Sequence, residues 1–144
     1  MASSASFGPL TSSRAFVRGS VVTILRLEGL AAAAITIVLY ARSGASWWLF
    51  AALWLVPDLS MLGYLHCSCW GARTYNAVHT YLGPTVLALF ALLAGAHNVL
   101  PVALIWANHI GVDRLLGYGL KYSEGFGFTH LGRLGRQQEI TQSR

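Results

Sequence analysis

The chain has 144 residues, of which 55% are hydrophobic and 10% are charged. Soluble domains carry roughly 25% charged residues, so this composition leaves too little polar surface for a water-soluble globule and indicates an integral membrane protein. The net charge of +5 comes without a basic run interleaved with aromatic residues, which argues against nucleic acid as a partner. Long leucine- and alanine-rich runs without period-two alternation favour an all-α fold over a β-barrel.

Four apolar runs predict an integral membrane four-helix transmembrane bundle in a single domain. We expect a disordered tail over residues 1–20, spans at about 21–41, 46–66, 74–94 and 99–118 within a bundle of about 21–122, and an interfacial loop and cytoplasmic tail over about 123–144. Basic residues concentrate in the two tails and the central connection. By the positive-inside rule, this predicts a multi-pass protein of the inner (plasma) membrane with cytoplasmic N- and C-termini and the lipid bilayer as its partner.

The first predicted span carries two charged residues, Arg26 and Glu28. Without them its apolar part would be about 13 residues, short of the ~20 that a span needs, so both are expected to enter the bilayer. The long Arg26 side chain can reach back to the headgroups. Glu28 is too short to do so, and we therefore expect it to face the interior of the bundle.

The second and third predicted spans each place polar residues near a helix distortion. Pro57 removes a backbone donor and is expected to kink the second span, which leaves Asp58 at the kink. In the third span, Asn76, His79 and Thr80 fall within about one turn and share a face. Polar groups at broken membrane helices commonly build an ion or substrate site.

The fourth predicted span holds His109 and Asp113, which are four residues apart and therefore lie on one helix face. Ionisable groups inside a membrane span are costly and mark a candidate functional site. Beyond this span, a glycine-rich segment carries His130. We expect this segment to turn back over the cytoplasmic face, with His130 as an outer ligand or proton carrier; an interfacial histidine without a role is the alternative.

The ionisable residues of all four spans are predicted to lie at one depth. At a rise of ~1.5 Å per residue, each lies about 8 to 13 Å from the same-side end of its helix. Oxygen and nitrogen donors of this kind suit a divalent transition metal such as Zn, Mn, Fe or Ni, and helical bundles build such sites from facing helices. The predicted metal ligands are Glu28, Asp58, His79, His109 and Asp113. The residues predicted to orient these ligands or to cover the site are Asn76, Thr80, Arg114, Lys121 and His130.

Other interpretations of the same residues remain open at this point. Imidazoles that titrate near neutrality can relay protons. Haem between His79 and His109 is disfavoured because carboxylates lie nearby. Polar residues also join helices through hydrogen bonds worth about 0.6–2 kcal/mol each, as in a packing module that binds a second copy or another membrane protein. The pair Cys67 and Cys69 lacks the second pair of ligands that a tetrahedral zinc site requires.

Several motifs, in order along the chain, resemble a family of unknown function. They are RLEGL (26–30), PDLSMLGY (57–64), YNAVHTY (75–81), HIGVDRLLGYGLKY (109–122) and THLG (129–132). Together they resemble domain-of-unknown-function family 4260 over about residues 24–135. The resemblance implies a small bacterial integral membrane protein and supplies no activity or catalytic residue. Its motif positions include Glu28, Asp58, Asn76, His79, His109, Asp113, Arg114, Lys121 and His130.

Overall fold

The computed structural model describes residues 19–133. Residues 1–18 of the predicted tail over 1–20, and residues 134–144 of the predicted loop and tail over 123–144, lie outside the described residues. The elements are α1 (Ser20–Arg42), α2 (Trp47–Trp54), the 3-10 helix η1 (Val56–Leu65), α3 (Ser68–Val78), α4 (Leu82–Leu93), α5 (Leu100–Leu116), β1 (Phe128–Thr129) and β2 (Gly132–Arg133). The predicted all-α character therefore holds, apart from a short antiparallel hairpin of β1 and β2.

Three helical segments are long and apolar enough to cross a membrane. They are Ser20–Arg42, Trp47–Leu65 and Ser68–Leu93, and they overlap the first three predicted spans. The fourth, α5, has 17 residues, which corresponds to about 26 Å against a hydrocarbon core of about 30 Å. The structure thus fits a membrane protein with three span-capable segments, and a fourth span through α5 stays a prediction.

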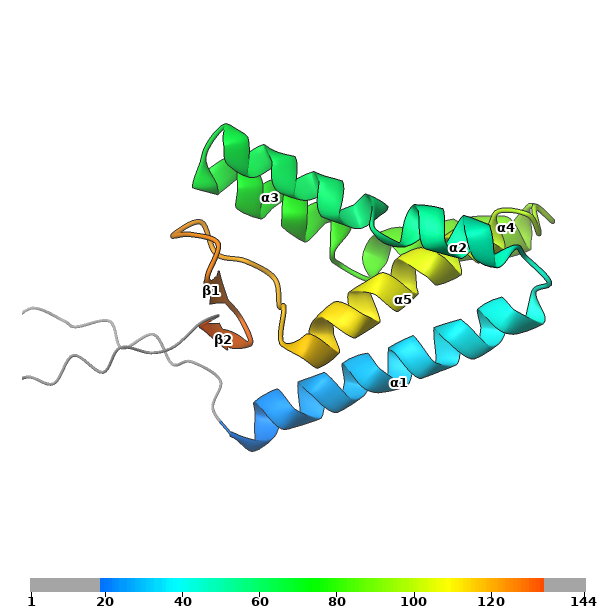
Figure 1. Ribbon diagram of the computed structural model, residues 1–144, viewed down its shortest axis with the longest axis horizontal. Coiled ribbons are helices and arrows are strands. Elements are labelled where there is room, and N and C mark those ends of the chain that lie inside the picture. The colour runs from blue at the N-terminus through cyan, green and yellow to red at the C-terminus, as the bar shows by residue number, and fades with distance from the viewer. Residues whose placement is uncertain (1–18, 134–144) are drawn as a thin grey trace, which may run out of the picture.

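Helix α5 lies at the centre of the molecule, between α1 on one side and the layer of α2, η1, α3 and α4 on the other (Figure 1). It is the helix that buries His109 and Asn108 together with apolar residues such as Ile105 and Ile110. By contrast, the outer helices expose large apolar side chains, among them Trp48 at 86%. In a bilayer these exposed surfaces would face lipid, while α5 forms the interior.

Small residues let α1 approach α5 closely. A Cβ atom added to Gly29 would lie 2.8 Å from the Gly111 carbonyl oxygen, and one added to Gly111 would lie 2.9 Å from the Gly29 carbonyl oxygen. Contacts of this kind are typical of membrane helix pairs. Arg26 reaches across the pair and donates to the carbonyl oxygens of Leu115 and Leu116 at 3.0 and 2.9 Å. It therefore binds the C-terminal end of α5, where unpaired carbonyls need donors.

Two of the span-capable segments are broken at the positions that carry site residues. The second changes from α-helix to 3-10 helix at Val56, with Pro57 in the first turn of η1. The third ends α3 at Val78 and resumes as α4 at Leu82, with Pro84 near its start. Proline is tolerated in a first turn because its missing N–H would be unpaired there anyway. The expected distortion at Pro57 is confirmed.

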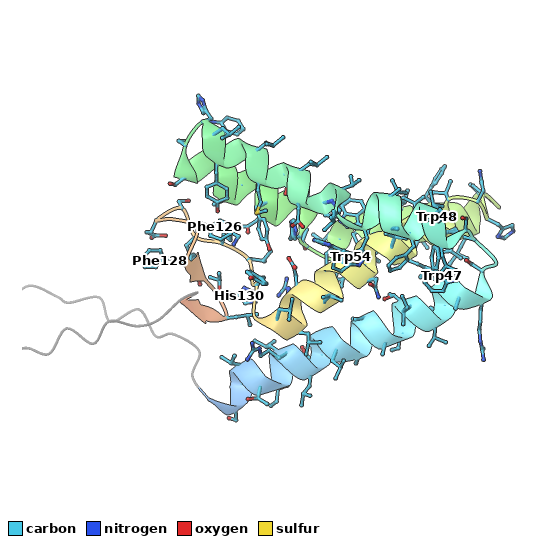
Figure 2. All side chains as sticks on the ribbon, viewed as in Figure 1. Trp47, Trp48, Trp54, Phe126, Phe128 and His130 are labelled. Atoms are coloured by element: carbon cyan, nitrogen blue, oxygen red, sulfur yellow. The ribbon has the colours of Figure 1, made fainter. Side chains whose placement is uncertain are left out.

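Aromatic residues mark both ends of the molecule. Trp47 and Trp48 lie at one end, and Phe126, Phe128 and His130 at the opposite end (Figure 2). The chain leaves α5 at Gly117 with φ 95°, a left-handed conformation that glycine adopts without strain. It then runs back along this second end, which is also where α1 begins (Figure 1). The segment after α5 thus returns to the bundle.

Candidate metal centre

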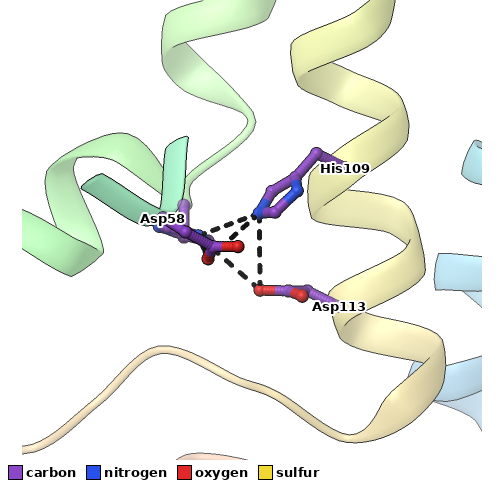
Figure 3. Close-up of side chains that lie close together, drawn as sticks. Asp58, His109 and Asp113 are labelled. Atoms are coloured by element: carbon purple, nitrogen blue, oxygen red, sulfur yellow. Dashed lines mark hydrogen bonds and ion pairs between the residues drawn. The ribbon is translucent and has the colours of Figure 1, made fainter. Parts of the chain in front are cut away.

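Four ionisable side chains converge where the broken segments meet α5. Asp58 comes from the first turn of η1, and His109 and Asp113 lie on α5 (Figure 3). His79 is the C-cap residue of α3. One potential ligand atom from each lies within 4.8 Å of all the others. The two histidines are 2% and 1% exposed, and both aspartates are half-buried. We call these residues the Asp2His2 cluster.

The spacing within the Asp2His2 cluster resembles that of ligand atoms around an ion. The two Nε2 atoms are 3.2 Å apart. His79 Nε2 lies 3.5 Å from Asp58 Oδ1 and 3.6 Å from Asp113 Oδ2, and His109 Nε2 lies 3.5 and 3.9 Å from the same atoms. Tetrahedral ligands at bonds of about 2.0–2.1 Å are separated by about 3.3–3.4 Å. A charge-assisted hydrogen bond would be shorter, about 2.7–2.9 Å.

Tyr75 holds two members of the cluster in place. The Nδ1 atom of His79 lies 3.0 Å from the Tyr75 carbonyl oxygen; a carbonyl only accepts, so Nδ1 donates, and in the neutral ring Nε2 then presents its lone pair to the cluster. The two rings stack at 3.7 Å with an interplanar angle of 9°. The Tyr75 hydroxyl also donates to Asp113 Oδ2 at 2.9 Å. Such outer contacts fix the orientation of metal ligands.

His109 is oriented by packing. Its ring meets the edge of Trp54 at a centroid distance of 5.1 Å, and Trp54 is itself held by a hydrogen bond from Nε1 to Asn108 Oδ1 at 3.0 Å. Within residues 19–133, His109 Nδ1 is buried without a hydrogen-bond partner. The other ring nitrogen, Nε2, points toward Asp58 and Asp113 (Figure 3).

Glu28, a predicted ligand, does not join the cluster. It is exposed on α1 and is absent from the converging group of described residues. The helix turns Gly29 and Ala33 toward α5, and consecutive residues of an α-helix point about 100° apart. Glu28 therefore points away from the interface. The expectation that it must face inward is corrected, because α1 buries few residues and those nearest Glu28 are the small Gly29 and Ala33.

Asn76 and Thr80 do not orient the ligands as predicted. The Asn76 side chain donates to the Lys121 carbonyl oxygen at 2.8 Å and accepts from the Lys121 backbone N–H at 2.7 Å. Asn76 thus fastens the segment after α5 to α3. In the described part of the chain, no hydrogen bond joins Thr80 to the Asp2His2 cluster. The residue that takes the predicted orienting role is Tyr75, one position before Asn76.

Arg114 and His130 contact each other beside the cluster. Arg114 Nη1 lies 2.9 Å from His130 Nε2, and the Leu120 backbone N–H donates to His130 Nδ1 at 2.8 Å. Burial and the neighbouring Arg114 charge lower the pKa of His130, while the Leu120 contact raises it. His130 turns toward the bundle, as expected for a cover, but its described contacts stop at Arg114 and do not reach the four ligands.

Lys121 is buried in an aromatic setting next to Tyr75. Its side chain is 3% exposed, and Nζ lies 3.5 Å from the Phe126 ring centroid and 4.6 Å from that of Tyr75. Nζ also donates to the Phe126 carbonyl oxygen at 3.3 Å. Burial lowers the pKa of Lys121, whereas the charges of Asp113 and Asp58 raise it. Lys121 thus lies over the ring of Tyr75, and its predicted role beside the site stays a prediction.

Sequence reasoning missed Tyr75 and Trp54, for different reasons. Tyr75 lies four residues before His79, so helical periodicity places it on the same face, one turn away; that signal was present. Trp54 contacts His109 from another segment of the chain, and no local pattern indicates that contact.

Comparison with known proteins identifies a family. Residues 22–134 match the family described as Domain of unknown function (DUF4260). No curated protein and no solved structure matches the chain. The matched region contains all four residues of the Asp2His2 cluster as well as Tyr75 and Trp54.

Proposed function

The chain belongs to the DUF4260 family, a domain of unknown function, and we propose that it is a membrane protein that binds a divalent transition metal. The ligands are His79 and His109 through Nε2 and Asp58 and Asp113 through carboxylate oxygens. Two imidazoles with two carboxylates suit Zn, Mn, Fe or Ni. The proposed site is enclosed by α5, η1 and the end of α3.

The observation that carries this proposal is the mutual spacing of the four ligand atoms. The four distances from an Nε2 atom to a carboxylate oxygen are 3.5 to 3.9 Å, which is longer than charge-assisted hydrogen bonds and closer to the edge of a tetrahedron around an ion. Because the Nε2 lone pair of His79 meets carboxylate oxygens, these atoms repel one another unless a cation or a proton lies between them. A metal ion satisfies all four at once.

The same spacing disfavours haem. Nitrogen ligands on opposite sides of an iron lie about 4 Å apart, from bonds of about 2.0–2.1 Å, whereas the two Nε2 atoms are 3.2 Å apart. The two aspartates also occupy the space around them, where a porphyrin ring would have to lie.

The test is elemental analysis of protein purified in detergent without chelator. We expect near-stoichiometric metal in the wild type and its loss in His109→Ala. His97→Ala is the matched control, because His97 is exposed in the turn before α5 and its loss should leave the metal in place. Wild-type protein that is metal-free and takes up none of the four metals would reject the proposal, and a copurifying red chromophore would indicate haem instead.

A proton pathway is the second candidate, and one contact favours it. The 3.2 Å separation of the two Nε2 atoms lets His79 and His109 share a proton, and Asp113 Oδ2 lies 3.6 and 3.9 Å from these atoms. This candidate requires a metal-free protein. In proteoliposomes it predicts proton flux that Asp113→Asn abolishes, whereas a resident metal would block the shared proton.

The proposed orientation places both termini in the cytoplasm, with α5 as a fourth span. The beginning of α1 and the segment after α5 lie at the same end of the molecule (Figure 1), which supports an even number of crossings. Reporter fusions after residues 70 and 135 should be cytoplasmic, and those after residues 43 and 97 should lie outside. A cytoplasmic signal at residue 97 would remove the four-span arrangement.

A further inference from the structure

A cavity of about 340 Å³ lies beside the Asp2His2 cluster. Apart from Ser60 its lining is apolar, and it includes Val56, Pro57, Val78, Val102, Ile105 and Trp106. Its volume falls within the range of about 300–1,000 Å³ that is typical of ligand pockets. Apolar cavities of this kind exclude water and accept apolar ligands.

The cavity and the cluster are built on the same elements. Pro57 immediately precedes Asp58 in η1, and Val78 immediately precedes His79 at the end of α3. Ile105 lies four residues before His109 on α5, on the same helix face. An occupant of the cavity would therefore lie next to the proposed metal.

One wall of the cavity is fixed by Trp106. Its Nε1 donates to the Val78 carbonyl oxygen at 2.7 Å, a carbonyl that the break between α3 and α4 leaves accessible. The indole also packs against Gly83, where an added Cβ would collide with the ring. The cavity is thus preformed, since the residue that shapes it is held by both a hydrogen bond and close packing.

The rim of the cavity lies among side chains that would face lipid. Val56 is 47% exposed, and its neighbours Leu55 and Leu59 are 59% and 61% exposed. All three belong to a segment that can cross a membrane. Hydrocarbon, and not water, would therefore surround the rim in a bilayer.

A buried hydroxyl on one lining residue favours one class of occupant. Ser60 Oγ is buried and, among the described residues, has no hydrogen-bond partner. A buried donor without a partner is costly, and one carbonyl oxygen would satisfy it. An acyl chain carries such a carbonyl, whereas a polyprenyl chain does not.

We propose that this cavity binds the acyl chain of a membrane lipid, with the carbonyl of the lipid at Ser60. The acyl chain would then lie next to the metal centre, a placement that rests on the proposed metal function. Binding of the chain itself does not depend on the metal.

The experiment uses the full chain in phosphatidylcholine vesicles that contain a phosphatidylcholine with a photoreactive diazirine on its acyl chain. Crosslinks are located by mass spectrometry, and metal content is measured on the same samples. We expect labelling to concentrate on Val102 and Ile105. Val102→Trp, which fills the cavity, should abolish this labelling and retain the metal. The control Leu92→Trp adds the same bulk to an exposed position of α4 and should leave the labelling unchanged.

A second comparison tests the carbonyl contact. Palmitic acid should displace the probe more effectively than hexadecane in the wild type, and Ser60→Ala should remove that advantage. If Val102→Trp does not fold, Val56→Trp at the exposed rim serves as the blocking variant.

The outcomes separate this inference from the metal proposal. Labelling that persists in His109→Ala, together with loss of metal, supports both. Cavity labelling in a wild-type protein that binds no metal keeps the acyl site and rejects the metal centre. Labelling spread evenly over the exposed helix faces, labelling that neither blocking variant reduces, or displacement by a polyprenyl alcohol but not by palmitic acid would overturn the acyl site.

Discussion

Asn108 and His109 are neighbours on α5, and both are buried, but their polar atoms have different surroundings. The Asn108 side chain donates to the Ala33 carbonyl oxygen at 2.9 Å and to Thr36 Oγ1 at 3.1 Å, and it accepts from Trp54 Nε1 at 3.0 Å. Its amide is satisfied on both sides by short hydrogen bonds. This is the pattern of a polar residue that joins helices.

His109 shows the opposite pattern. Its Nδ1 atom has no hydrogen-bond partner within residues 19–133, and its Nε2 atom lies 3.2 to 3.9 Å from three other potential ligand atoms. The comparison shows that burial alone does not distinguish a packing contact from a ligand site. The distances to partner atoms distinguish the two, because helix-joining contacts are of hydrogen-bond length, whereas ligand atoms are spaced widely enough to admit an ion between them.

The largest expected effect comes from removing one carboxylate ligand. Asp113→Asn keeps the shape of the side chain and removes its charge, so metal affinity should fall by more than the roughly 10–100-fold that is typical of losing an outer partner. Competition with a coloured chelator measures it. The matched control is Glu28→Gln, the same chemical change on the exposed face of α1. Equal affinities in the two variants would place Asp113 outside the site.

A smaller effect is expected when the support of the ligands is weakened. Tyr75→Phe removes the hydroxyl that donates to Asp113 but keeps the ring that stacks on His79. Metal affinity should fall by roughly 10–100-fold, while metal stoichiometry at saturation stays unchanged. An unchanged affinity would mean that Tyr75 only packs.

Asn108→Ala should lower stability and leave metal affinity unchanged, in contrast to the Asp113 and Tyr75 variants. It leaves the Trp54 indole N–H and the Ala33 carbonyl without their partners, which should lower the free energy of unfolding by about 1–2 kcal/mol. Metal affinity should stay close to that of the wild type. Thermal unfolding in detergent and chelator competition measure the two quantities. Loss of metal without loss of stability would contradict the division between the two neighbours.

The smallest expected effect is a pH dependence of stability that comes from His130, in the segment after α5. Because the pKa of His130 is lowered in the folded state, the unfolded state binds more protons as the pH falls below about 6.5. The contribution of His130 to stability should be complete above that pH and should decline below it. Thermal unfolding across pH 5–8 should show a smaller acid loss in His130→Gln than in the wild type. If the unfolding temperatures of the wild type and His130→Gln fall equally with decreasing pH, His130 does not contribute to the pH dependence.

Much of the fold could be predicted because it depends on local signals. Apolar length indicated the first three spans, and Pro57 indicated the break that carries Asp58. Periodicity on α5 paired His109 with Asp113. The orientation of α1 could not be derived, because its buried stripe depends on Gly29 meeting Gly111 across the chain. The sequence grouped Glu28 with the four residues of the Asp2His2 cluster because all five were predicted at the same depth in the bilayer. A common depth does not specify the direction in which a side chain points.

X-ray absorption at the edge of the copurifying metal tests the central claim most directly. The account predicts a first shell of nitrogen and oxygen at about 2.0–2.1 Å, with the outer scattering of two imidazoles, and the loss of one imidazole's contribution in any His79 or His109 variant that still retains metal. A shell of oxygen alone, or sulfur at about 2.3 Å from Cys67 and Cys69, would contradict it.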